Sequence, residues 1–157
     1  ACLILLIFAK LWKIDFRDME WYGIDKKGNI AVFCSAGEGY LPEFVCEDRD
    51  RADMIACFFE KYQKCTQSIV LHKMTDFAAQ AACSFSDKGL YYFDSDDCTE
   101  YNTCILHNYY TKVSYPEKPL HYNMLPKNIK ELLKYNFMDI EDFSKCHTIS
   151  VRHTYKT

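Results

Sequence analysis

The sequence has little glycine, only 5 among its 157 residues, and this excludes a collagen-like or linker-rich chain. It also lacks an excess of basic side chains, since 19 Lys and Arg stand against 22 Asp and Glu and give a formal net charge of −3. A protein that binds nucleic acid generally needs a basic face for the phosphates, so the composition argues against that class of partner. The apolar share of 49% excludes a disordered chain, and the length fits one domain with a core of its own.

The apolar run at residues 1–9 is too short to cross a membrane, because Lys10 closes it and a transmembrane helix needs about 20 residues. It also lacks the basic start and the small-residue cleavage site of an export signal. We therefore expect residues 1–18 to be an apolar appendage to a single domain of residues 19–157, with no membrane partner. Residues 1–16 must bury their apolar side chains on the domain or on a second chain, so self-association through this segment stays open.

Cysteine is abundant, with nine residues, but no C-x-x-C pair occurs. An odd number would leave one thiol over in a fully paired disulfide framework. Several cysteines stand in apolar patterns; Cys34 follows Ala-Val-Phe and Cys83 follows two alanines, where a free thiol behaves as a small hydrophobe. Disulfides are rare in a reducing cytosol, so we expect free thiols and a cytoplasmic protein. A secreted protein with disulfides is the alternative.

The best candidate for a metal or thiol site is Cys98-x5-Cys104-x2-His107, with Cys146 and His147 as remote ligands. Structural zinc usually has two to four residues between paired ligands, and here the first gap is longer. None of the five histidines stands in a recognised nucleophile motif. We therefore expect no catalytic residues, no metal and no cofactor. A metal-binding protein or thiol enzyme that uses Cys98, Cys104 and His107 is the alternative.

Hydrophobic patterning predicts an α+β fold, a single domain with a mostly antiparallel sheet and about three helices. Apolar residues at positions 55, 58, 59 and 62 repeat with the period of one buried helical face. Gly28 is expected to be the left-handed residue of a β-hairpin turn. The predicted strands are 20–25, 29–35, 68–72, 90–94, 101–115 and 146–155, and the predicted helices are 47–66, 75–85 and 127–135.

Acidic side chains are unevenly distributed. Residues 38–60 hold seven acidic side chains against two basic ones, and residues 94–100 hold four carboxylates without the spacing of a calcium loop. An acidic face steers a basic partner, and tyrosines near it suit an interface because they bury area and keep a polar tip. The alternative for the carboxylates of residues 94–100 is a solvated turn, and the alternative for the abundant tyrosines is half-buried sheet surface. The candidate interface residues are Glu38, Tyr40, Glu43, Asp94, Asp96, Asp97 and Glu100.

Two sets of apolar and turn residues together carry a family resemblance. They are residues 21–25 (WYGID) with 28–33 (GNIAVF), and residues 89–94 (GLYYFD) with Tyr115-Pro116 and Leu125-Pro126. Over roughly residues 20–135 the chain resembles a family of small bacterial proteins that look like the immunity proteins of polymorphic secreted toxins. The resemblance implies a cytoplasmic, non-catalytic binding protein that neutralises a cognate toxin by covering its active site. It assigns no functional residue, and the acidic surface favours a basic toxin as the protein partner.

Overall fold

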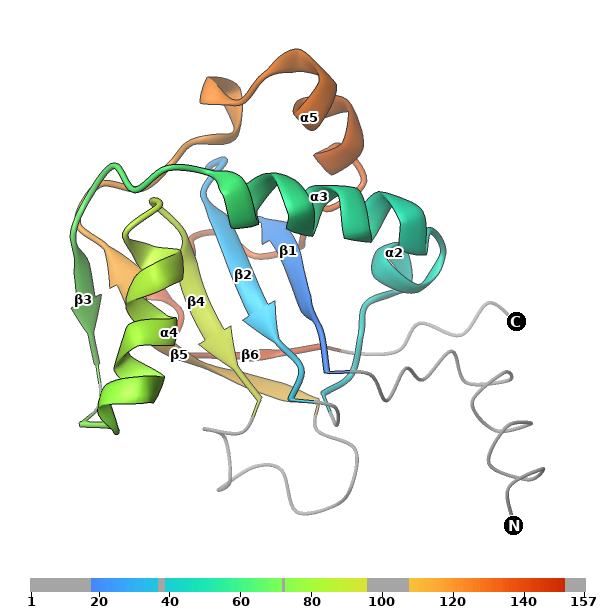
Figure 1. The fold of residues 1–157 in the computed structure, drawn as a ribbon. Coiled ribbons are helices and arrows are strands. Elements are labelled where there is room, and N and C mark those ends of the chain that lie inside the picture. The colour runs from blue at the N-terminus through green and yellow to red at the C-terminus, as the bar shows by residue number, and fades with distance from the viewer. Residues whose placement is uncertain (1–17, 37–38, 72, 96–107, 152–157) are drawn as a thin grey trace, which may run out of the picture.

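The computed structural model describes residues 18–36, 39–71, 73–95 and 108–151, which form one α+β domain (Figure 1). The predicted fold class is therefore confirmed. These residues contain four α-helices rather than about three, because the short α2 gives no helical repeat in the sequence. The elements in chain order are β1 (Glu20–Ile24), β2 (Ile30–Cys34), α2 (Glu43–Cys46), α3 (Arg49–Lys61), β3 (Ser68–Val70), α4 (Asp76–Ser86), β4 (Tyr91–Asp94), β5 (Tyr109–Pro116), the 3-10 helix η1 (Tyr122–Met124), α5 (Lys127–Leu133), the 3-10 helix η2 (Phe143–Lys145) and β6 (Thr148–Ser150).

The six strands form one sheet in the order β1-β2-β4-β5-β3, and β6 also pairs with β5. Four of the five strand pairs are antiparallel and only β2 with β4 is parallel, so the predicted mostly antiparallel sheet is confirmed. Strand β5 pairs with β4 along one edge, while β3 and β6 follow one another along its other edge. Figure 1 shows α3 and α4 in front of the sheet, which curls so that β5 and β6 cross behind β1, β2 and β4.

The hairpin of β1 and β2 forms where the sequence predicts it. Gly28 has a φ of 86°, a left-handed conformation that side chains other than glycine rarely adopt. A Cβ atom at this position would also lie 2.4 Å from Nε2 of His121, so a side chain here would in addition require the His121 ring to move. The Asp25 carboxylate accepts hydrogen bonds from the amides of Lys27 (3.0 Å) and Asn29 (2.8 Å) and closes the turn.

The connection from β2 to β4 contains α2, α3, β3 and α4. Helix α3 begins at the Asp48 cap, whose carboxylate accepts a hydrogen bond from the amide of Arg51 at 2.9 Å. It ends at Lys61, so the prediction of a helix over 47–66 was too long at both ends. Helix α4 covers Asp76–Ser86, close to the predicted 75–85, and begins after Thr75, whose hydroxyl accepts a hydrogen bond from the amide of Ala78.

The C-terminal third differs from prediction mainly in the length of its elements. Strand β5 covers 109–116, while residues 101–107 of the predicted strand lie outside the described residues. Pro126 is the N-cap of α5 and precedes its first helical residue. Among the described residues of the predicted strand 146–155, β6 covers Thr148–Ser150, the three residues that pair with β5, and residues 152–155 lie outside the described part of the chain.

Strands β1, β2 and β4 are buried on both faces of the sheet, and this explains why they read as nearly continuous apolar runs. On the helix side, Tyr22 stacks on Phe59 of α3 with ring centroids 4.6 Å apart. On the other side, Trp21 stacks on Phe33 at 4.0 Å, and Phe33 stacks on Phe93 at 5.1 Å. Much of the aromatic content therefore lies in two cores separated by the sheet.

The six cysteines among the described residues are free thiols. Cys34, Cys46 and Cys146 pack against the core that contains Trp21 or the core that contains Tyr22, whereas Cys57 and Cys65 are exposed. No helix in the described part of the chain is long and apolar enough to cross a membrane.

Candidate functional site

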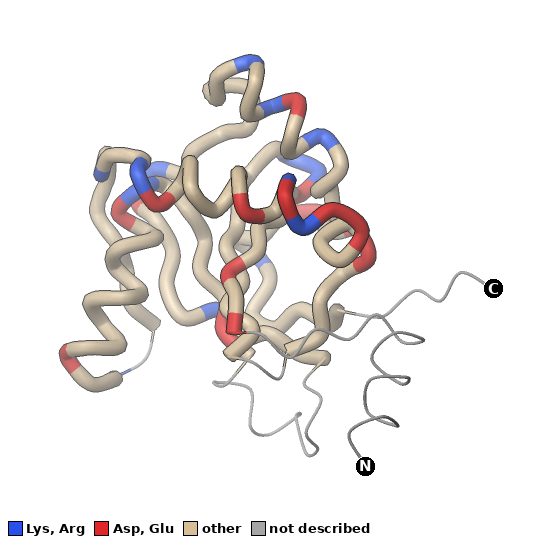
Figure 2. The backbone as a smooth tube through the Cα atoms, turned by 45° about the vertical axis from the view of Figure 1, so that its right-hand side comes forward, with Lys and Arg blue, Asp and Glu red and all other residues tan. Residues whose placement is uncertain are grey.

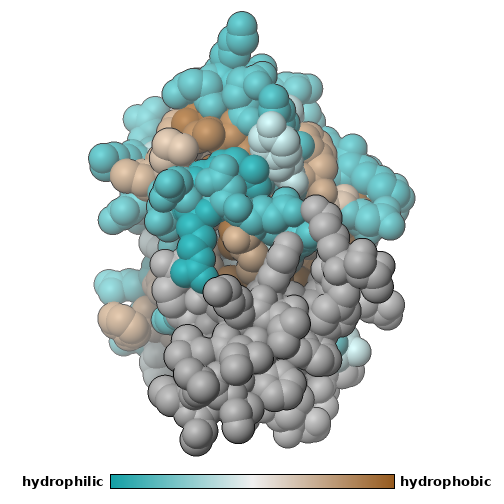
Figure 3. Space-filling view, turned by 90° about the vertical axis from the view of Figure 1, so that its right-hand side faces the viewer, coloured by the Kyte–Doolittle hydropathy of each residue, from teal (hydrophilic) through white to brown (hydrophobic). Residues whose placement is uncertain are grey.

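A groove of about 470 Å³ lies between α2 and the segment that follows α5; we call it the acidic groove. Three carboxylates line it, those of Glu43, Glu47 and Asp139. Figure 2 shows acidic positions gathered along α2 and the start of α3. Figure 3 views the molecule from the side of α2 and shows apolar side chains exposed between hydrophilic ones. The other lining residues are Pro42, Phe44, Phe137, Met138, Ile140, Ser150 and Val151.

The first wall of the acidic groove is α2, which is held by its apolar side. Pro42 is extended and its carbonyl accepts the amide of Val45 at 3.0 Å, so the chain turns there into a single helical turn. Val45 is buried in the core that contains Trp21, while Glu43 and the half-buried Phe44 line the groove. The Phe44 ring also packs edge-on against Trp21, with ring centroids 6.0 Å apart. The guanidinium of Arg51 donates a hydrogen bond to the Phe44 carbonyl and ties α2 to α3.

The second wall runs along the outer edge of β1. The amide of Ile24 donates to the Asn136 carbonyl at 2.9 Å, and the amide of Met138 donates to the Ile24 carbonyl at 2.8 Å. Phe137, between them, is 46% exposed. The pairing covers an edge that would otherwise present free backbone groups, and it fixes the position of Phe137 in the groove. Asp139 follows and forms an ion pair with Lys26 at 2.9 Å.

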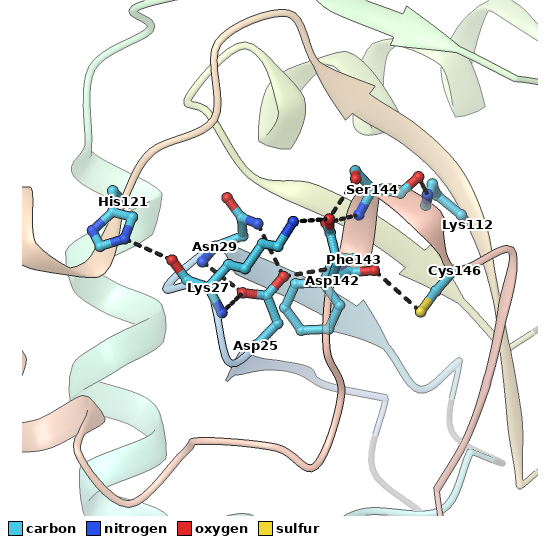
Figure 4. A network of polar contacts seen from close by, with 9 residues as sticks. All are labelled: Asp25, Lys27, Asn29, Lys112, His121, Asp142, Phe143, Ser144 and Cys146. Carbon is cyan, nitrogen blue, oxygen red and sulfur yellow. Dashed lines mark hydrogen bonds and ion pairs between the residues drawn. The ribbon is translucent and has the colours of Figure 1, made fainter.

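A buried polar network holds this second wall from behind (Figure 4). The fully buried carboxylate of Asp25 accepts the amide of Phe143 at 2.8 Å as well as the turn amides, so it joins the hairpin to η2. Asp142 accepts hydrogen bonds from Nζ of Lys27 (2.8 Å) and from the amide (2.9 Å) and hydroxyl (2.6 Å) of Ser144. The Lys27 ammonium and the Ser144 donors hold the pKa of Asp142 far below its usual range. The carboxylates of Asp25 and Asp142 thus hold backbone segments in place through their hydrogen bonds to amides.

The candidate interface residues predicted from the sequence do not all lie together. Glu43 lines the acidic groove, and the Tyr40 carbonyl accepts a hydrogen bond from the Tyr110 hydroxyl at 2.8 Å in the core beneath it. Asp94 lines a different pocket of about 360 Å³ beside α4, where it accepts a hydrogen bond from the Tyr92 hydroxyl at 2.8 Å. Residues Glu38, Asp96, Asp97 and Glu100 lie outside the described residues.

Comparison of the chain with protein-family models, with curated proteins and with solved structures finds no match.

Two of the half-buried thiols are poorly suited to nucleophilic chemistry. Burial, together with the nearby Asp94 carboxylate, raises the pKa of the Cys34 thiol to about 12, and burial also raises the pKa of the Cys146 thiol. A thiolate is the reactive form, so both thiols are protonated at neutral pH. No cluster of three or more metal-ligating side chains occurs in the described part of the chain. Cys98, Cys104 and His107 lie outside it.

Proposed function

We propose that this chain is a non-catalytic binding protein whose acidic groove takes a basic segment of a partner protein. The observation that carries the proposal is one depression that combines the carboxylates of Glu43, Glu47 and Asp139 with the apolar side chains of Phe44 and Phe137. Interfaces gain affinity from a few buried aromatic anchors and gain association rate and specificity from charge. The expected partner segment carries Lys or Arg next to an apolar side chain.

The groove is built in a way that favours binding without rearrangement. Its first wall is held by the buried Val45 and its second wall by backbone pairing with Ile24, so the exposed groups stand on rigid supports. A preformed site loses less conformational entropy on binding than a mobile one.

The resemblance to immunity proteins suggests the kind of partner. A toxin that acts on nucleic acid needs Lys and Arg in its active site to hold phosphates, and an acidic groove matches such a site in charge. Inhibition would then come from occlusion of that active site in the cytoplasm of the producing cell. This proposal requires no catalytic residue in the chain.

The proposal predicts a toxin gene beside this gene, and a neighbourhood of metabolic genes would contradict it. The direct test is a charge reversal in the groove, measured by calorimetry with that toxin, produced with an inactivated catalytic site. Glu43→Lys with Glu47→Lys should weaken binding by about 30-fold or more, since two reversed charges cost about 2 kcal/mol at minimum. The matched control is Glu60→Lys with Glu117→Lys, which changes the net charge equally outside the groove and should change affinity by less than about 3-fold. Circular dichroism checks that both variants are folded.

Equal weakening by the two pairs of reversals would point to net charge and overturn the groove as the site. Unchanged affinity in the groove variant would also overturn it. The pair Asp96→Lys with Asp97→Lys tests the other predicted acidic segment separately, and a loss confined to that variant would place the interface there.

A further inference from the structure

Strand β3 ends the sheet on the side of β5, and Figure 1 shows it as the outermost strand on the left. Two hydrogen bonds fix the direction of its backbone groups. The amide of Leu71 donates to the Val113 carbonyl at 2.9 Å, and the amide of Glu117 donates to the Gln67 carbonyl at 2.9 Å. In an antiparallel pair, residues that bond to the neighbouring strand alternate with residues whose amide and carbonyl point away from it.

Ser68 and Val70 therefore present an open sheet edge. They alternate with the residues bonded to β5, so their amides and carbonyls point outward, and no other strand of the described residues lies beyond them. Edge strands are usually protected by charged side chains, by proline, by a bulge or by a covering element. Residues 65–71 (CTQSIVL) contain no charged side chain and no proline, and β3 pairs with β5 in regular register. The edge is thus suited to receive another strand.

The apolar side chains of β3 are exposed on the sheet face that lies away from α4. The Ser68 hydroxyl donates to the Cys83 carbonyl of α4 at 3.2 Å, so Ser68 faces the helix. Because side chains alternate along a strand, Ile69 and Leu71 face the other way. Ile69 is 38% exposed and Leu71 is 42% exposed. A strand added at this edge would cover part of both.

The edge is complementary to a second copy of itself. In an antiparallel pair with a two-fold axis at Ile69, Ser68 of one copy lies opposite Val70 of the other, and each amide donates to the facing carbonyl. The two Ile69 side chains then lie directly opposite one another, with Cβ atoms about 4.5–5.5 Å apart. Residues 65–71 bring no like charges together in this register, and they offer a charged partner segment no ion pair. The pairing also closes two open edges at once.

We propose that two copies of this chain associate through β3, so that their sheets join into one continuous sheet. The contact is small, and interfaces below about 1,200 Å² are typically weak, so the expected Kd is about 10–100 μM. The acidic groove lies beside β1, at the other end of the strand order, so this association does not depend on the function proposed for the groove.

The test is sedimentation equilibrium of the full chain over concentrations that span this Kd. Ile69→Lys and Ile69→Glu each place like charges opposite one another on the axis and remove the contact between two apolar side chains, so each should weaken association by about 10-fold or more. An equal mixture of the two variants should regain association as a heterodimer, which native mass spectrometry distinguishes from either homodimer by mass. Recovery in the mixture also shows that both variants fold.

Further variants separate the β3 edge from other surfaces. Val70→Pro removes an outward amide and spares the amides that bond to β5, so it should weaken association by about 10-fold. Met54→Lys is the matched control, because Met54 is 51% exposed on α3 and the charge change equals that of Ile69→Lys; it should leave Kd unchanged. Leu5→Lys with Leu6→Lys tests self-association through the apolar run at residues 1–9 and should also leave Kd unchanged.

Three results would overturn the proposal. One is a native chain that stays monomeric at about 500 μM, well above the Kd expected for such a contact. Another is a loss in Met54→Lys or in the Leu5 and Leu6 variant as large as that in Ile69→Lys. The third is a mixture of Ile69→Lys and Ile69→Glu that associates no better than either variant alone.

Discussion

Asp142 shows how a single buried carboxylate holds a long segment in place. It is 6% exposed, yet three donors from Lys27 and Ser144 satisfy it. Neither Asp25 nor Asp142 stands in a recognisable motif, and their partners lie up to 118 residues away along the chain. Pairings of this kind depend on how the elements pack, and sequence spacing does not report them.

The stability of the protein should therefore depend on Asp142 in a pH-dependent way. Its pKa is lowered in the folded state, so its contribution is present above the unfolded value of about 3.9 and is lost as the pH falls below that value. Asp142→Asn should reduce the free energy of unfolding by about 1–2 kcal/mol at pH 7, and the difference from the native protein should shrink by pH 2.

Urea unfolding followed by tryptophan fluorescence at pH 7, 4 and 2 measures this effect. Asp139→Asn is the matched control, because Asp139 is 95% exposed and its ion pair with Lys26 is at the surface, where such pairs contribute about 0–1 kcal/mol. A difference between Asp142→Asn and the native protein that persists undiminished at pH 2 would contradict the electrostatic account.

At the scale of elements, prediction from sequence succeeded where one periodic pattern governs a segment. The hairpin turn at Gly28 and the buried face of α3 are of this kind. The end of α3 was misplaced because Tyr62 continues the apolar repeat although its backbone is extended, with a ψ of 135°. The centroid of the Tyr62 ring still lies 5.5 Å from that of the Phe58 ring, so side-chain packing continues beyond the last helical residue. The apolar repeat in the sequence therefore extends further than the helix does.

The pairing of residues 136–138 with β1 is another element that no local pattern predicts. Its contribution can be tested at Met138, whose amide donates to the Ile24 carbonyl. Met138→Pro removes this donor and should lower the free energy of unfolding by about 2–3 kcal/mol more than Met138→Ala, which removes the side chain and keeps the amide.

Hydrogen exchange locates the effect. In Met138→Pro the amide of Ile24, bonded to the Asn136 carbonyl, should lose protection, and in Met138→Ala it should keep most of it. Equal stability of the two variants would show that the pairing contributes little and that the second wall of the groove is held by side chains.

At the scale of the whole molecule, the acidic groove assembles segments that are far apart in the sequence. Glu43 was predicted as an interface residue, because it lies in an acidic stretch. Phe137 and Asp139 were not, since they reach the groove only through the pairing of their segment with β1, more than 100 residues earlier in the chain. Asp94, by contrast, lies in the pocket beside α4 although it belongs to the second acidic cluster of the sequence. Local charge thus pointed to Glu43, one of the three carboxylates that line the groove, and the topology of the sheet determined which charges lie together.

The charge and apolar components of the groove should separate in the kinetics of partner binding. Long-range attraction between the groove and a basic partner acts on the association rate and is screened by salt, with a Debye length of about 10 Å at 0.1 M and about 3 Å at 1 M. Stopped-flow association should therefore slow by about 10-fold or more between 50 and 500 mM NaCl. Dissociation should change little with salt, because the contacts of Phe44 and Phe137 with the partner are apolar. Phe137→Ala should instead speed dissociation and leave the salt dependence of the association rate unchanged. A salt-independent association rate would refute electrostatic steering by this surface.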